Sequence, residues 1–431
     1  MRYERAPRSL GLAYGPALLR GFLPRSQALH VVDRIGATLY GSSPIDTVAM
    51  STNGAKESDH ISAIDGLRGI ACLAVVIHHC YVHCGKYQWP SVDIAGHTMA
   101  LSRVLGYGNG GVELFFVLSG FCLASPFFRR SKAEPWRRWF LKRAYRILPP
   151  YYGSALLFWG LYTVLHKHPF SLFGMLSPPT GEVSLKGAFV CVTLLNAYFN
   201  PSYWTLALEA RWYLVFPLLI MLWRRAGSVL LVCGSLFACA ASLWLTSWSP
   251  RFVLLTAKVL TFLPIFVAGM LIARWTAEAT TPRRLIRAAP WGLLASLLFV
   301  VATVPSDGSE GAMPMVIPWG LVAFFALIST LTNRRLSRFA RTPAFVRIGV
   351  FSYSLYLTHE PIVHLAYALF EQHKPTPAVQ FLVYECGLVP VCVGIGYVFY
   401  RIIERPFVQR GRVLFTRTPL PALTPHSTSH S

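Results

Sequence analysis

The stretch that decides the fold is Ile64-Asp65-Gly66-Leu67-Arg68-Gly69-Ile70-Ala71-Cys72-Leu73-Ala74-Val75-Val76-Ile77-His78-His79. It is apolar enough to enter a bilayer, yet it carries a cation at Arg68 and an imidazole at His79. Eleven residues are close to three helical turns, so these two side chains share one helix face, about 16 Å apart along the axis. Because ionisable groups at membrane depth are costly, the pair indicates a functional site.

The composition of the whole chain indicates a polytopic membrane protein. Of its 431 residues, 54% are hydrophobic and 13% are charged, about half the charged fraction of a typical soluble domain. A net charge of +22 on a soluble protein would suggest nucleic-acid binding. Here the basic residues gather in short loops between apolar runs, where they report membrane orientation. We therefore expect membrane lipids, and no nucleic acid, as partners.

The apolar runs predict an all-α fold with about ten transmembrane helices and both termini in the cytoplasm. The predicted spans are residues 64–83, 111–128, 149–166, 204–223, 228–247, 252–273, 290–304, 315–333, 349–370 and 379–402. Alternate loops dense in arginine and lysine, beginning with 129–146, are cytoplasmic by the positive-inside rule. Residues 186–199 are apolar but too short for a crossing, so we expect them to be re-entrant or interfacial on the outer side.

Three regions follow from this reading. Residues 61–408 are the predicted transmembrane domain. Residues 1–60 show no signal-peptide pattern and predict a polar, flexible N-terminal tail. Residues 409–431 end in a stretch rich in proline, serine, threonine and histidine, which predicts a disordered C-terminal tail.

Two ionisable residues are placed toward the outer half of the predicted bundle. His79 lies high in the first span, and Glu113 opens the second span from the same side. A neutral imidazole can accept a proton from a hydroxyl near neutral pH, and a nearby carboxylate would orient it and stabilise its charged form. This predicts a catalytic role for His79 and Glu113. The alternative is a structural histidine that bonds two helices together.

At the cytoplasmic end, Arg68 is joined by the pair Arg143 and Arg146. Two arginines three residues apart on a helix share a face and can bind phosphate through bidentate hydrogen bonds. We therefore expect these three residues to bind an anionic cofactor. The alternative is an orientation signal that also meets anionic lipid head groups.

Further polar residues are predicted to bind substrate. Glu209 lies beside the interfacial aromatic Trp204, a combination that suits sugar hydroxyls, and His359 sits in the polar segment 352–359 of the ninth span. Structural hydrogen bonds are the alternative for each. His79 and His83 have the i, i+4 spacing of metal ligands, but two nitrogens on one helix are not a site without further ligands. The sequence alone therefore predicts no metal.

Taken in order, these segments resemble the membrane acyltransferase-3 family. The resemblance rests on Asp65-Gly66-Leu67-Arg68-Gly69 with ten residues between Arg68 and His79, Gly111-Val112-Glu113-Leu114-Phe115-Phe116-Val117-Leu118-Ser119-Gly120-Phe121, Arg143-x-x-Arg146, Tyr203-Trp204-Thr205-Leu206 with Glu209, Ser352-Tyr353-Ser354-Leu355-Tyr356-Leu357-Thr358-His359, and Glu404-Arg405-Pro406. The match is collinear over residues 61–408. It implies about ten transmembrane helices and transfer of an acyl group, usually acetyl, from cytoplasmic acyl-CoA. It also implies that Arg68 and His79 are essential and that Arg143 and Arg146 lie on the donor side.

The sequence therefore predicts a membrane O-acyltransferase of the bacterial inner (plasma) membrane. Its donor would be acyl-CoA, with acetyl-CoA expected, and its acceptor a hydroxyl of a cell-envelope glycan or lipid-linked saccharide. Acylation of a small secondary metabolite is one alternative. A proton-coupled transporter or flippase of lipid-linked glycan is another, with Arg68, His79 and Glu113 as a proton relay. The sequence shows no inverted repeat with paired broken helices to favour the transporter.

Overall fold

Helices form at the predicted apolar spans, because a segment inside a bilayer must satisfy its own backbone hydrogen bonds. The computed structural model describes residues 52–84, 89–94, 97–129, 134–166, 200, 202–248, 256–303, 315–370, 373 and 375–416. The α-helices are α2 (Thr52–His83), α3 (Gly111–Arg129), α4 (Trp136–His166), α6 (Tyr203–Trp248), α7 (Thr256–Glu278), α8 (Arg283–Thr303), α9 (Val316–Thr332), α10 (Arg334–Ala340), α11 (Pro343–Val350), α12 (Ser352–Phe370), α13 (Pro377–Phe381), α14 (Val389–Phe399) and α15 (Arg405–Thr416).

Short elements of other kinds complete the described chain. Strand β1 (Ser91–Ile94) pairs antiparallel with β2 (His97–Ala100). This hairpin between α2 and α3 is an addition to the predicted all-α class. A 3₁₀ segment, η1 (Leu101–Gly110), leads into α3. Two π-helical segments, η5 (Leu382–Leu388) and η6 (Tyr400–Glu404), flank α14 within the last predicted span.

The predicted tails are only partly described. Residues 52–60, assigned to the N-terminal tail, form the first part of α2, and residues 409–416, assigned to the C-terminal tail, form the end of α15. Residues 1–51, 186–199 and 417–431 lie outside the described residues.

Helix α6 contains two of the predicted spans, 204–223 and 228–247. The chain breaks between them at Gly227, with φ 79° and ψ 175°. A residue with a Cβ rarely adopts this positive φ, whereas glycine does so readily. The glycine therefore provides the turn between the two predicted crossings.

Several helices meet the physical requirements for crossing a membrane. Six described helical stretches are long and apolar enough, and a seventh qualifies if α9 and α10, bent by 103°, count as one span. Large apolar side chains also face outward: Leu214, Phe237 and Trp291 are 71%, 76% and 73% exposed. Such a surface suits lipid rather than water. The chain is therefore an all-helical integral membrane protein apart from its hairpin, while ten spans and cytoplasmic termini remain predictions.

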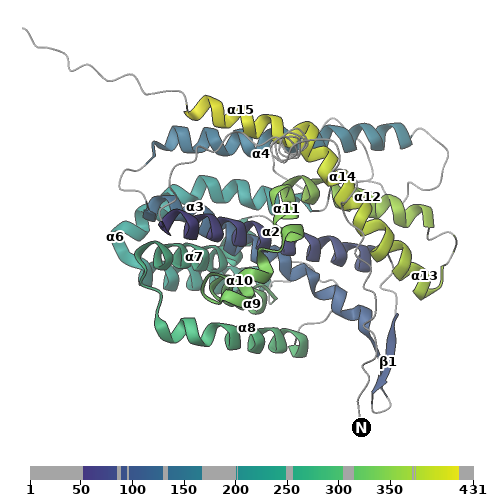
Figure 1. The fold of residues 1–431 in the computed structure, drawn as a ribbon, viewed down its shortest axis with the longest axis horizontal. Helices are drawn as coiled ribbons and strands as arrows, with labels where there is room; N and C mark the ends of the chain where they lie inside the picture. Colours follow the sequence, from purple (N-terminus) through teal and green to yellow (C-terminus); the bar gives the residue numbers. More distant parts are fainter. Residues whose placement is uncertain are drawn as a thin grey trace, which may run out of the picture. The chain divides into compact units, whose positions relative to one another are not determined.

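The helices of residues 58–416 pack mainly side by side, with α8 along one edge of the bundle and α15 beside α4 along the opposite edge (Figure 1). The most extensive contact between described helices joins α3 to α7, and it is close. A Cβ added at Gly120 would lie 2.1 Å from the Phe266 carbonyl oxygen, and one at Gly269 would lie 2.0 Å from the Val117 oxygen. Small residues thus bring the two backbones together, as is common between membrane helices.

The candidate site forms where α2 meets α12 and the start of α6. The Cys72 thiol of α2 donates to the Ser352 carbonyl oxygen at 3.4 Å, and Asn200 Nδ2, just before α6, donates to the Leu357 oxygen at 3.1 Å. These bonds tie together segments that are far apart in the sequence.

Candidate active site

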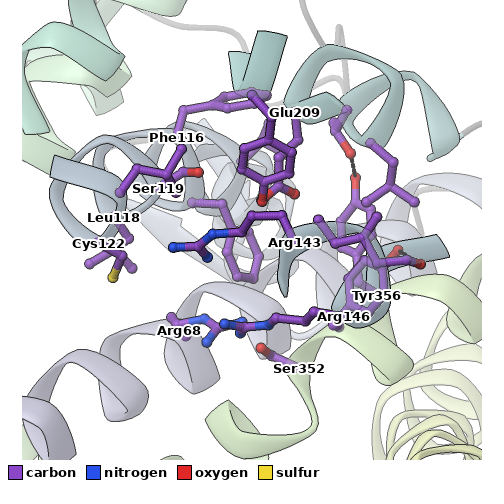
Figure 2. A pocket seen from close by; sticks show the side chains of 18 residues that line it. Arg68, Phe116, Leu118, Ser119, Cys122, Arg143, Arg146, Glu209, Ser352 and Tyr356 are labelled. Carbon is purple, nitrogen blue, oxygen red and sulfur yellow. Dashed lines mark hydrogen bonds between the residues drawn. The ribbon is translucent and has the colours of Figure 1, made fainter. Parts of the chain in front are cut away.

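Three arginines line one pocket, which we call the arginine pocket. Its cavity volume is about 130 Å³, and its lining includes Arg68 of α2, Arg143 and Arg146 of α4, Glu209 and Tyr213 of α6, and Tyr356 of α12. Figure 2 shows the guanidinium groups of the three arginines turned into this space. The structure thus brings together the three residues predicted to bind the cofactor.

Arg68 and Arg143 are each held by neighbours. Arg68 Nη1 lies 3.9 Å from Asp65 Oδ1, one turn earlier on α2. The Arg143 guanidinium lies 5.7 Å from the ring centre of Trp139 and 5.9 Å from that of Tyr213, distances at which cation–π attraction acts. These contacts hold the cationic groups at one wall of the pocket while their hydrogen-bond donors stay available for an anion.

Glu209 was expected to form a sugar-binding site with Trp204, but it lines the arginine pocket. Its carboxylate belongs to the arginine pocket, and its Oε1 accepts a hydrogen bond from the Tyr213 hydroxyl at 2.5 Å. Trp204 is not among the residues that line this pocket. Its ring packs on Phe262 at 5.8 Å and lies 4.0 Å from the Lys258 ammonium nitrogen. The structure therefore does not bring the Trp204 ring to the pocket that holds Glu209.

His79 lies against a second buried imidazole. His79 Nδ1 and His359 Nε2 are 2.8 Å apart, and the two rings are 2% and 0% exposed. The pair adjoins the arginine pocket through Tyr356, whose ring centre is 5.4 Å from that of His359. His359, predicted as a substrate-binding or relay residue, is thus a direct partner of His79.

The hydrogen bonds of His359 determine which nitrogen of His79 carries the proton. His359 Nδ1 lies 2.9 Å from the Tyr356 carbonyl oxygen. A carbonyl can only accept, so Nδ1 of His359 is protonated, and Nε2 of the neutral ring is an acceptor. His79 therefore donates from Nδ1, and the lone pair of neutral His79 is on Nε2. This is the tautomer that a general base needs.

Glu113 is buried in the first turn of α3. The neighbouring Gly111 packs against α2, where an added Cβ would lie 2.5 Å from the Ala71 carbonyl oxygen and 2.9 Å from Val75 Cγ2. The start of α3 therefore lies about one to two helical turns below His79 on α2. The catalytic role of Glu113 remains a prediction.

Glu360 belongs to the site but was not predicted as a site residue from the sequence. This buried carboxylate follows His359 directly, and its Oε1 lies 3.5 Å from His83 Nε2. Its Oε2 accepts hydrogen bonds from the Ser202 backbone N–H and hydroxyl. The sequence feature that could have indicated it is a glutamate inside a predicted span, four residues before His364. The same spacing separates His79 from His83.

The described fold and site define a polytopic membrane protein with a cationic pocket beside a buried pair of histidines. A family model described as an acyltransferase domain, of the acyltransferase-3 type, matches residues 61–401. The chain belongs to this family of membrane acyltransferases, which confirms the predicted enzyme class.

Individual relatives carry related names. The chain is 27% identical to a protein named as a membrane-bound transacylase, BcsY, of Komagataeibacter xylinus, over 79% of this chain and 81% of the relative. It is 24% identical to the acyltransferase MdmB of Streptomyces mycarofaciens, over 84% and 94%. It is 23% identical to the O-acetyltransferase OatA of Staphylococcus aureus, over 84% of this chain but only 59% of the relative. No solved structure matches significantly.

Proposed function

We propose that this acyltransferase moves an acetyl group from cytoplasmic acetyl-CoA to a hydroxyl of a cell-envelope glycan or lipid-linked saccharide. We further propose a bacterial inner (plasma) membrane location, about ten spans and cytoplasmic termini. The observation that carries the proposal is the convergence of Arg68, Arg143 and Arg146 on one pocket that adjoins His79 and His359. The similarity to a protein named O-acetyltransferase supports acetyl as the group and a hydroxyl as the acceptor.

The donor end of the proposal rests on charge. Coenzyme A carries several phosphate charges, and arginine binds phosphate through paired, charge-assisted hydrogen bonds. Apolar pocket residues such as Phe115, Phe116 and Leu118 would receive the less polar arm that carries the thioester. Arg68 and His79 are separated by about 16 Å along α2, so phosphates at the arginines leave the arm room to extend toward His79.

The transfer step uses the His79 tautomer assigned above. The acceptor hydroxyl gives its proton to His79 Nε2 while its oxygen attacks the thioester carbonyl carbon. The resulting tetrahedral intermediate breaks its C–S bond, and protonated His79 returns the proton to the leaving thiolate. His359 holds the other ring nitrogen throughout. In the proposal Glu113 stabilises the charged imidazole, and Glu209, which lines the arginine pocket, contributes to acceptor binding.

The proposal is tested in cells in which the gene for the His79→Ala variant replaces the wild-type gene. We expect the O-acetyl signals in NMR spectra of surface glycans to disappear, as they would on deletion of the gene. His373→Ala, at an exposed histidine, is the matched control and should retain them. If His79→Ala accumulates at the wild-type level in the membrane and still acetylates its acceptor, the proposed mechanism is wrong.

A further inference from the structure

Three imidazoles and one carboxylate gather where the last turn of α2 meets α12. They are His79, His83, Glu360 and His364, which we call the histidine–carboxylate cluster. Each helix contributes two of them at i, i+4 spacing, so both pairs face the same space from opposite sides. From the sequence no metal was predicted, because His79 and His83 alone do not make a site; the fold places Glu360 and His364 beside them.

The distances within the cluster suit a transition metal. Ligand atoms about 2.1 Å from a tetrahedral metal lie about 3.4 Å from one another. His83 Nε2 is 3.5 Å and His364 Nε2 is 3.9 Å from Glu360 Oε1. One ligand atom from each of His79, His83 and Glu360 lies within 4.8 Å of the others. His79, His83 and Glu360 are therefore close enough to hold one ion, and His364, beside Glu360, is placed to approach as a fourth ligand.

Outer contacts already orient the ligands. His79 donates from Nδ1 to His359, so its Nε2 lone pair is the one assigned to a metal. Glu360 Oε2 accepts from Ser202, so Oε1 faces the imidazoles. In metal sites a ligating histidine typically donates its other N–H to a neighbouring acceptor, and ligating carboxylates are themselves hydrogen-bonded. The cluster shows both features.

Two further observations favour a ligand over simple packing. The His364 Nε2 atom is buried and makes no hydrogen bond within the described residues. The His83 side chain is 32% exposed, which leaves a route by which an ion can reach the cluster. Imidazole with one carboxylate is the donor set preferred by zinc and similar first-row metals.

We propose that the histidine–carboxylate cluster binds a divalent first-row transition metal, represented by Zn²⁺, with His79, His83, Glu360 and His364 as ligands. Metal binding itself is independent of the proposed function. One consequence rests on that function: a metal on His79 Nε2 occupies the lone pair that accepts the acceptor's proton. The metal-bound form and the base-active form are then mutually exclusive, and Zn²⁺ should inhibit acetyl transfer at the concentration at which it binds.

The test measures Zn²⁺ binding by isothermal titration to the full-length protein, purified in detergent and treated with a chelator. We expect one ion per chain, and a Kd raised tenfold or more in His83→Ala and in His364→Ala, because each removes one ligand. His373→Ala is the control and should bind as the wild type does. No saturable binding to the wild type, or an unchanged Kd in both ligand variants, would overturn the proposal and leave the cluster as ion pairs only.

A second measurement needs no variant. Co²⁺ added to the chelator-treated wild type should give the visible absorption of a four-coordinate nitrogen and oxygen site, and Zn²⁺ should displace it. Absence of this spectrum would also overturn the site. Both readouts are separate from acyl transfer. If His79→Ala is inactive and the wild type binds no metal, the proposed function stands and the metal site is rejected. If His79→Ala is active and the wild type binds metal, the metal site stands and the proposed function is rejected.

Discussion

Removing one arginine from the arginine pocket should weaken acetyl-CoA binding by an amount that can be worked out from its contacts. A hydrogen bond to a charged group contributes about 1.5–3 kcal/mol, and every 1.4 kcal/mol is about tenfold in Kd. Arg143→Ala should therefore raise the Kd by about 10- to 100-fold. Arg146→Ala should cost at least as much, because Glu404 and Glu209 are among the electrostatic neighbours of Arg146, and their repulsion of an incoming phosphate would then be opposed by fewer positive charges.

Arg143→Lys separates charge from shape. Lysine keeps the positive charge but loses the planar group that forms paired hydrogen bonds and stacks on Trp139 and Tyr213, so its Kd should lie between those of the wild type and Arg143→Ala. Binding is measured by isothermal titration of acetyl-CoA into detergent-purified protein at one fixed salt concentration. Arg284→Ala, at an exposed arginine of α8 outside the pocket lining, is the control. If Arg143→Ala and Arg146→Ala elute as folded protein and bind within threefold of the wild type, the donor site is not this pocket.

Three further predictions follow from single contacts. His359→Ala removes the hydrogen-bond acceptor for His79 Nδ1, so kcat should fall at least tenfold while the Kd for acetyl-CoA stays unchanged. Steady-state kinetics give kcat, and isothermal titration of acetyl-CoA gives the Kd. If kcat and Kd change together, His359 does not act by positioning His79. Gly269→Ala places a Cβ 2.0 Å from the Val117 oxygen, so it should lower the free energy of unfolding by about 1–3 kcal/mol. Thermal unfolding should show a lower midpoint, and an unchanged midpoint would contradict the close α3–α7 contact. Gly227→Ala, at φ 79°, should destabilise by about 1–2 kcal/mol, whereas Gly234→Ala, mid-helix with open space around it, should not destabilise.

The helical fold was predictable because its causes act locally along the chain. Transfer of apolar side chains into a bilayer and the need for internal backbone hydrogen bonds decide where helices form. The break between two predicted spans near residue 227 was visible for the same reason. The β1–β2 hairpin was not predicted, because each of its strands has only four residues, the lower limit at which alternation of polar and apolar residues signals a strand.

The site was predictable only where its residues share one helix. Arg143 and Arg146 lie three residues apart, so their common face follows from helix geometry. The partner of His79 did not follow, because His359 is 280 positions away and no local rule relates two helices so distant in the chain. The sequence analysis offered Glu113 at a matching depth, and the fold added His359 as a direct neighbour.

The sequence by itself determined the membrane class and the approximate helices, since these depend on hydrophobicity and helical rise; the depth of Arg68 and His79 in the membrane stays a prediction. Only the tertiary structure decided that Arg68 joins Arg143, Arg146 and Glu209 in one pocket and that His83 meets Glu360. These groupings depend on how helices approach one another, which close contacts such as Gly120 against Phe266 fix. Packing between distant segments, rather than local pattern, turned separate polar residues into one site.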